Sequence, residues 1–131
     1  MEILYSLGID DKDIKFMLEQ VSSIKDMSEE EINEKIDILN YVGCNYRHIK
    51  NIIISNPYYL CRMNEDILKL ISYLKKIGIN NVNLLFDSNP YFLNYDRFEI
   101  EEYVNNKLDI GMELEDIIDS IEDNPYIIDE D

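Results

Sequence analysis

The chain has 131 residues, 46% of them apolar, and a formal net charge of −16 at pH 7. This length and composition suit a single folded domain over residues 1–131. The sequence has no run of about eighteen apolar residues, which excludes a membrane-spanning helix, and its start lacks the basic-then-apolar pattern of a secretory signal.

The first predicted unit, residues 1–27, is partial. A helix ends at Gly8, where glycine adopts the left-handed backbone conformation without the steric cost of a side chain. In the Schellman form of this cap, the apolar residue after the glycine pairs with the residue four before it, and Ile9 and Leu4 fit that pattern. The unit closes at Ser22-Ser23, where later units carry a proline.

The second predicted unit, residues 28–62, shows the full pattern. Ser28 and Glu31 form a capping box at the start of a helix that ends at Gly43. A second, shorter helix then runs to the tripeptide Asn56-Pro57-Tyr58. The residue before a proline avoids the helical region, whereas asparagine suits an N-cap and proline suits the first helical position. The tripeptide therefore predicts a corner that ends one helix and starts a short turn.

The third and fourth predicted units, residues 63–95 and 96–131, repeat these marks. Each second helix is expected to begin its apolar stripe six residues after the glycine, at Ile14, Ile49, Leu84 and Ile117. The corner tyrosines are expected to pack against the neighbouring unit: Tyr58, Tyr59, Tyr91 and Tyr126.

Every glycine and proline in the chain lies on one period. The glycines are 35, 35 and 33 residues apart, and the prolines are 33 and 35 apart. These structural marks are Gly8, Gly43, Gly78 and Gly111, with Pro57, Pro90 and Pro125, each proline preceded by Asn56, Asn89 or Asn124. A unit of this size cannot bury its apolar face alone, so neighbours must stack. The sequence predicts an all-α solenoid, right- or left-handed, of about three and a half helix–helix–3-10 turn repeats.

The repeat closely resembles that of the mitochondrial transcription termination factor (mTERF) family. The shared order is L-x-x-L/I/V-G, then apolar positions, then P-x-x-L/I, as in Leu39-to-Gly43 and Pro57-to-Leu60. The resemblance covers nearly the whole chain. It implies a left-handed superhelix with two helices and a short 3-10 turn per repeat, and a basic groove that binds nucleic acid in many members.

Charge is distributed unevenly along the chain. Residues 40–80 carry 6 basic and 2 acidic side chains, whereas residues 81–131 carry 2 basic and 15 acidic ones. The basic middle offers five candidate contacts to nucleic-acid phosphate: Arg47, Lys50, Arg62, Lys75 and Lys76. Solvated helix faces and favourable charges at helix C-termini are the alternative explanation.

The acidic end offers a second candidate surface. Glu115, Asp119 and Glu122 share one helix face by their spacing, and Asp123 adjoins them. Such a row suits a basic protein partner or imitates a phosphate track. A solubilising cap over the end of the array is the alternative.

Catalysis finds little support in the sequence. His48 is the single histidine, and Cys44 and Cys61 have no metal-ligand spacing. We therefore expect no enzyme activity, no cofactor and no metal. Two cysteines without a disulfide pattern indicate a reducing, cytoplasmic setting.

Three functional hypotheses follow from these patterns. Because the net charge repels polyanions, the first is a non-enzymatic, regulatory module that binds a protein. The second is an mTERF-like nucleic-acid-binding regulator that uses the basic middle. The third is a nucleic-acid mimic that inhibits a basic partner. The sequence sets neither the partner's identity nor the oligomeric state.

Overall fold

The computed structural model describes residues 1–130, and within that range all regular structure is helical. The elements in chain order are α1 (Glu2–Ser6), α2 (Asp11–Gln20), η1 (Ser22–Asp26), α3 (Glu29–Tyr41), α4 (Tyr46–Ser55), η2 (Pro57–Cys61), α5 (Asn64–Ile77), α6 (Val82–Ser88), η3 (Pro90–Asn94), α7 (Arg97–Asp109), α8 (Leu114–Asp123) and α9 (Ile127–Glu130). The η elements are short 3-10 helices. The all-α prediction is confirmed.

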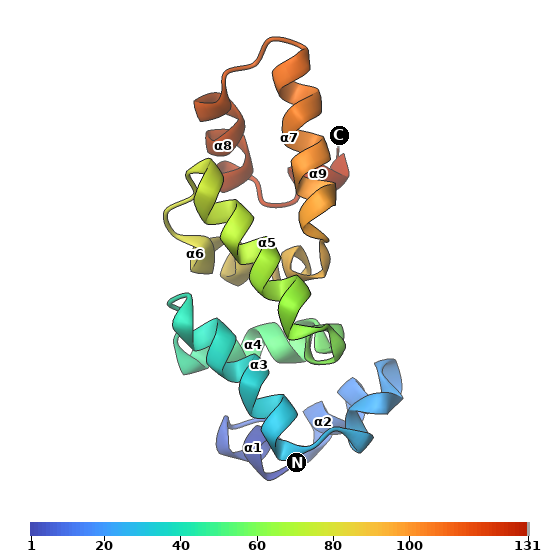
Figure 1. The fold of residues 1–131 in the computed structure, drawn as a ribbon. Coiled ribbons are helices and arrows are strands. Elements are labelled where there is room, and N and C mark those ends of the chain that lie inside the picture. Colours follow the sequence, from blue (N-terminus) through green and yellow to red (C-terminus); the bar gives the residue numbers. More distant parts are fainter. Residues whose placement is uncertain (131) are drawn as a thin grey trace.

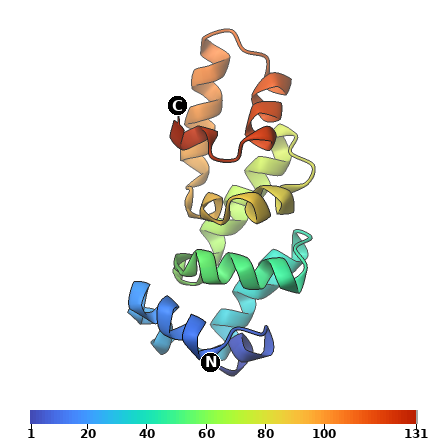
Figure 2. The ribbon, with the colours of Figure 1, turned by 180° about the vertical axis from the view of Figure 1, so that it is seen from behind.

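The helices form an elongated stack of repeats (Figure 1). The first helices of successive repeats, α1, α3, α5 and α7, contact one another in order, and α2, α4 and α6 form a second column. The 3-10 helices η1, η2 and η3 make a third column, and Figure 2 shows the second column from behind. Each repeat thus buries its apolar face against its neighbours, as expected for an α-solenoid.

The glycine caps are confirmed at all four positions. The φ angles are positive, at 88°, 106°, 114° and 95° for Gly8, Gly43, Gly78 and Gly111. After each glycine, the next backbone N–H donates to the carbonyl five residues earlier, for example from Ile9 to Leu4 at 3.1 Å. This is the Schellman bond, and it fixes the turn between the two helices of every repeat.

The corners follow the prolines only in part. 3-10 helices start at Pro57 and Pro90 as predicted. The first repeat forms η1 at its corner without any proline. After Pro125 the expected 3-10 helix is replaced by a turn and the short helix α9. The backbone therefore bends at this place in every repeat, and proline reinforces the bend without being required for it.

The corner asparagines also link neighbouring repeats, a role that the sequence analysis missed. Asn56 Nδ2 donates to the backbone carbonyl of Pro90 at 3.0 Å, and Asn89 Nδ2 donates to that of Pro125 at 3.0 Å. The predicted cap is present at Asn89, whose Oδ1 accepts from Tyr91 N. It is absent at Asn56, where Asn94 Nδ2 occupies Oδ1 instead. Asn56 and Asn89 are both buried.

The prediction that the corner tyrosines pack against the neighbouring unit is confirmed for Tyr126, whose hydroxyl donates to the Ser88 carbonyl at 3.3 Å, whereas Tyr58 and Tyr91 are largely exposed. Tyr58, Tyr91 and Tyr126 are 55%, 53% and 43% exposed. The buried aromatic side chain is the one two residues after the proline, Tyr59 or Phe92. In a 3-10 turn only one side of three faces the core, and the first tyrosine lies on an outer side.

The expected stripe position Leu84 is also wrong, since its side chain is 55% exposed. Only 12 residues separate Gly78 from Pro90, against 14 in the other two complete units. The deletion shortens α6 to 7 residues and shifts its helical phase. Val82, Leu85 and Phe86 are buried there instead.

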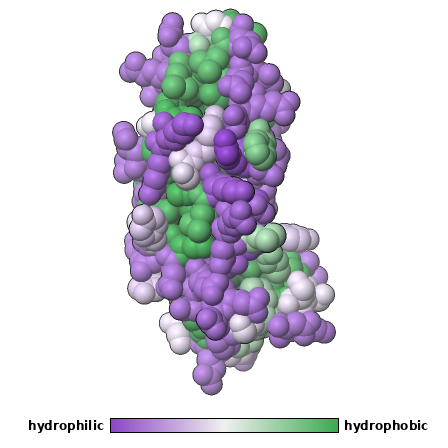
Figure 3. All heavy atoms as spheres, viewed as in Figure 1, coloured by the Kyte–Doolittle hydropathy of each residue, from purple (hydrophilic) through white to green (hydrophobic). Residues whose placement is uncertain are grey.

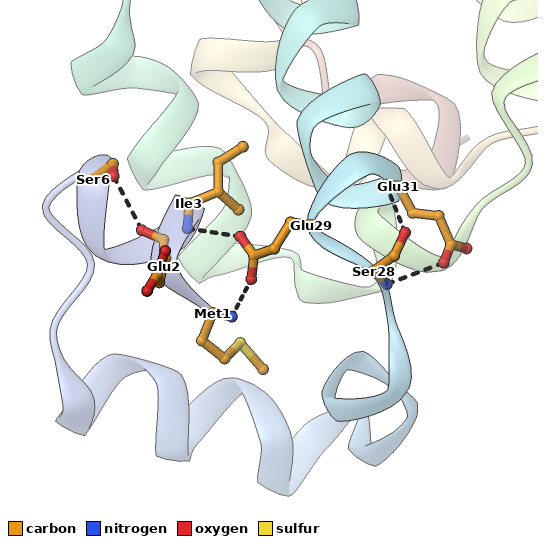
Figure 4. A network of polar contacts seen from close by, with 7 residues as sticks. All are labelled: Met1, Glu2, Ile3, Ser6, Ser28, Glu29 and Glu31. Atoms are coloured by element: carbon orange, nitrogen blue, oxygen red, sulfur yellow. Dashed lines mark hydrogen bonds and ion pairs between the residues drawn. The ribbon is translucent and has the colours of Figure 1, made fainter.

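The first repeat is attached by a polar network between α1 and α3 (Figure 4). The Glu29 carboxylate accepts from the Ile3 backbone N–H at 2.9 Å and from the Met1 ammonium group. Beside it the predicted capping box is confirmed, because Ser28 and Glu31 exchange both of its hydrogen bonds. The pKa of Glu29 is lowered mainly because its carboxylate accepts from the Met1 ammonium, and the Ile3 backbone N–H adds to this effect. The pKa of Glu31 is lowered mainly because its carboxylate accepts from the Ser28 backbone N–H.

The face seen in Figure 3 is hydrophilic over most of its area, and hydrophobic residues show in patches along its length. Within residues 1–130, no helix combines the length and apolar character that crossing a membrane requires.

Candidate nucleic-acid interface

The helix-to-helix turns of the first three repeats lie along one edge of the stack (Figure 1). We call this the turn edge and define it by Gly8, Gly43, Gly78 and the helix ends that flank them. Four of the five predicted cations belong to helix ends or turns on this edge: Arg47, Lys50, Lys75 and Lys76. The fifth, Arg62, lies at the opposite end of the second repeat, after η2.

Lys75 and Lys76 are exposed in the last turn of α5. Their charges complement the partial negative charge at the C-terminus of this helix. The Lys75 ammonium lies 5.1 Å from the ring centre of Tyr41, which is the last residue of α3 in the preceding repeat. No carboxylate among residues 1–130 forms an ion pair with either lysine.

The cations of α4 differ in their surroundings. Arg47 is exposed at the start of the helix. Lys50 lies over the turn at Gly8, close to Asp10. The pKa of Asp10 is lowered chiefly because its carboxylate accepts from the Asp13 backbone N–H, and the charge of Lys50 adds to this effect. His48 Nδ1 is 3.0 Å from Asp87 Oδ2 on α6, so this histidine contributes to packing between two repeats.

Arg62 does not fit the predicted role of an open phosphate contact. Its Nη1 donates to the backbone carbonyls of Leu93 at 2.6 Å and Tyr95 at 2.9 Å. These carbonyls end η3, so the guanidinium caps the corner of the next repeat. Arg62 therefore links two repeats. It is close to the other cations in sequence but does not lie on the turn edge.

The structure also groups three cations that the sequence analysis did not bring together. A hollow of about 210 Å³ between α5 and α7 is lined by Lys69, Ser72, Tyr73, Lys76 and Arg97. Arg97 was overlooked because it belongs to the acidic last third of the sequence. The stacking of α7 on α5 carries it to the basic middle.

Among residues 1–130 there is neither a cluster of metal ligands nor an activated thiol at Cys44. No cluster of three or more metal-ligating side chains occurs among residues 1–130. Cys44 is buried, and this burial together with the negative charge of Asp87 raises the pKa of its thiol to about 12. A thiol of that pKa is a poor nucleophile.

Comparison with protein families tests the resemblance inferred from the repeat motif. The model of the mTERF family matches residues 1–130. The chain belongs to the mTERF family. Comparison with curated proteins found no match. The mTERF match spans all four repeats and therefore confirms the resemblance inferred from the repeat motif.

Family membership favours the nucleic-acid hypothesis over the protein-partner hypothesis, which the net charge had favoured. The mTERF-family proteins are helical-repeat regulators for which nucleic acid is the expected partner. A binding role, without catalysis, is also what the family suggests.

The acidic surface predicted for the last repeat is exposed on α8 in this mTERF-family chain. Its four members are Glu115, Asp119, Glu122 and Asp123. None of them forms an ion pair with a cation among residues 1–130. Their role as a partner surface stays a prediction.

Proposed function

We propose that this mTERF-family chain is a regulator that binds nucleic acid through phosphate contacts on its turn edge. The observation that carries the proposal is the match of the family over residues 1–130. The contacts we assign are Arg47, Lys50, Lys75 and Lys76, and Arg62 is excluded because it caps the next repeat.

Two features of the turn edge support this assignment. Arg47, Lys75 and Lys76 are exposed and have no ion-pair partner in the described range, so their charges are available to a ligand. They also come from two successive repeats, which spreads them along the stack. A charged polymer such as a nucleic acid can contact such a row at several phosphates.

The net charge of −16 does not prevent such binding at physiological ionic strength. Charges separated by more than about 8 Å are largely screened from one another in 0.15 M salt. The last repeat adjoins the turn edge at Gly78, where Ile118 of α8 lies close, so screening acts on its more distant carboxylates rather than on all of them. Repulsion from distant carboxylates therefore weakens, while direct contacts between lysine and phosphate persist.

The test is a binding titration with labelled duplex DNA and, separately, single-stranded RNA, each over a range of salt concentrations. We expect binding that falls as salt rises, because phosphate contacts release counterions. The double substitution Lys75→Gln with Lys76→Gln should weaken binding and reduce the salt slope by about two, one for each lost contact.

The matched control is Lys12→Gln with Lys15→Gln, on α2 in the first repeat. Both of these lysines are exposed, and their loss changes the net charge equally. The control should bind as the wild type does. Absence of binding to either nucleic acid at low salt, or an equal loss in both double variants, would refute the assignment.

A second candidate function rests on the acidic surface of α8. Its exposed, unpaired carboxylates suit a basic protein partner, either a protein bound for regulation or an enzyme inhibited by mimicry of nucleic acid. Capture of a basic protein that is lost on neutralising Glu115, Asp119, Glu122 and Asp123, with no loss in the Lys75/Lys76 variant, would favour this function.

A further inference from the structure

We propose that the hollow between α5 and α7 is a binding site for a phosphodiester group. It is lined by Lys69, Ser72, Tyr73, Lys76 and Arg97. The proposal rests on the proposed function for the source of the phosphate, a nucleic-acid backbone. It shares Lys76 with the turn edge and extends the contacts to the other residues that line the hollow.

The helical register of α5 accounts for one wall of the hollow. Lys69, Ser72, Tyr73 and Lys76 follow the spacing i, i+3, i+4 and i+7, which places them on one face of a helix. The opposite wall is Arg97, the first residue of α7. Figure 1 shows the start of α7 beside α5. Donors therefore approach the hollow from two repeats.

Arg97 is held in place before any ligand arrives. Its guanidinium carbon lies 5.9 Å from the ring centre of Tyr73 and 5.1 Å from that of Phe98. Its Nη2 is 3.3 Å from Glu101 Oε2, one turn further along α7. The side chain remains 36% exposed, so a ligand has access to it. A guanidinium oriented in this way loses little conformational freedom when it binds an oxyanion.

The charge of the site matches a singly charged anion. Three cations line the hollow, and two of them have a carboxylate partner outside its lining: Glu65 is 3.1 Å from Lys69, and Glu101 contacts Arg97. Lys76 has no ion-pair partner among residues 1–130. The local excess is thus one positive charge, which suits a phosphodiester better than a doubly charged phosphate monoester.

Hydroxyl groups and volume complete the fit. Ser72 and Tyr73 each offer a hydroxyl donor, and burial raises the pKa of the Tyr73 phenol further above its ordinary value. The hollow of about 210 Å³ is large enough to hold several water molecules. A phosphate with its two ester carbons can enter and displace that water.

The test uses the isotopically labelled full chain and follows NMR shifts of Ser72, Lys76 and Arg97 side-chain and backbone groups. Dimethyl phosphate probes the isolated diester, inorganic phosphate the free anion, and a short duplex DNA the polymer. We expect saturable shifts at these residues with the diester and the duplex, with inorganic phosphate weaker. Lys12 and Lys15, exposed on α2, report non-specific effects and should not saturate.

Two substitutions separate binding from folding. Arg97→Lys keeps the charge but removes the planar fork, and should weaken the diester about tenfold, equivalent to about 1.4 kcal/mol. Ser72→Ala removes one neutral donor on an exposed position and should weaken it less. Saturation at the same concentration in wild type and Arg97→Lys, or shifts shared equally with Lys12 and Lys15, would overturn the site.

The outcomes distinguish this site from the proposed function. If duplex DNA binds through Lys75 but the hollow shows no saturable shift with any probe, the inference fails and the function stands. If the diester saturates the hollow but neither duplex DNA nor single-stranded RNA binds, the site stands as one for a small phosphodiester and the function fails.

Discussion

The corner asparagine is the residue that joins one repeat to the next. Asn89 is almost fully buried, donates from Nδ2 to Pro125 O and accepts at Oδ1 from Tyr91 N. A primary amide suits this place because it offers both a donor and an acceptor on a short side chain. Buried polar groups are costly unless they are hydrogen-bonded, so the amide and its two backbone partners depend on one another.

Replacing Asn89 by alanine should destabilise the fold by about 1–3 kcal/mol, since it leaves a buried carbonyl and N–H without partners. The control is Asn124→Ala. Asn124 is partly exposed, and its Nδ2 donates to the exposed Glu130 side chain, so water can replace it. Urea denaturation should therefore give a clearly lower midpoint for Asn89→Ala only. Equal losses of stability in the two variants would contradict the role of Asn89 in joining neighbouring repeats.

The two thiols should differ in reactivity. Cys44 is buried with a pKa near 12, whereas Cys61 is exposed, so iodoacetamide at a mildly alkaline pH should modify one cysteine in the folded protein. Intact-mass measurement should show one adduct before denaturation and two after it. A Cys61→Ser variant should show none while folded. Two rapid adducts on the native wild type would mean that the Cys44 thiol is not protected.

At the scale of elements, a residue with a special backbone conformation predicted helix ends better than a fixed spacing along the sequence predicted buried positions. Each glycine marks a helix end by a conformation that it alone adopts cheaply, so the four turns could be placed from the sequence. The phase of α6 could not, because a two-residue deletion rotates a short helix and exposes Leu84. Similarly, Tyr58 and Tyr59 are adjacent residues of the same type, and only the geometry of the 3-10 turn determines that the second is buried.

The turns at Gly78 and Gly111 separate two costs of adding a side chain: backbone strain and a steric contact with the next repeat. Gly78 and Gly111 both have positive φ, so alanine at either position should cost about 1 kcal/mol from the backbone alone. A Cβ on Gly78 would lie 3.2 Å from Ile118 Cδ1 of the next repeat, while a Cβ on Gly111 would meet nothing within 4 Å. Gly78→Ala should therefore lower the melting temperature more than Gly111→Ala. The reverse order would contradict the packing of α8 on this turn.

At the scale of the whole molecule, charge along the sequence is a poor guide to charge in space. Counting by segment grouped Arg62, which caps η3, with the other cations of the basic middle, and it omitted Arg97, which reaches the hollow from an acidic segment. A solenoid brings together residues about one period apart, so a surface is composed of positions from several repeats. Only the stacked structure shows which positions those are.

The net charge of −16 should also make stability depend on salt in the direction opposite to nucleic-acid binding. Carboxylates that repel one another destabilise the compact state, and added salt shortens the range over which that repulsion acts. Thermal unfolding should therefore shift to higher temperature between low and physiological salt, while the affinity for duplex DNA falls. Neutralising Glu115, Asp119, Glu122 and Asp123 on α8 should reduce the salt dependence of stability and leave that of binding unchanged. A melting temperature that fell with salt would show that attractive ion pairs, rather than repulsion, dominate the electrostatics of this fold.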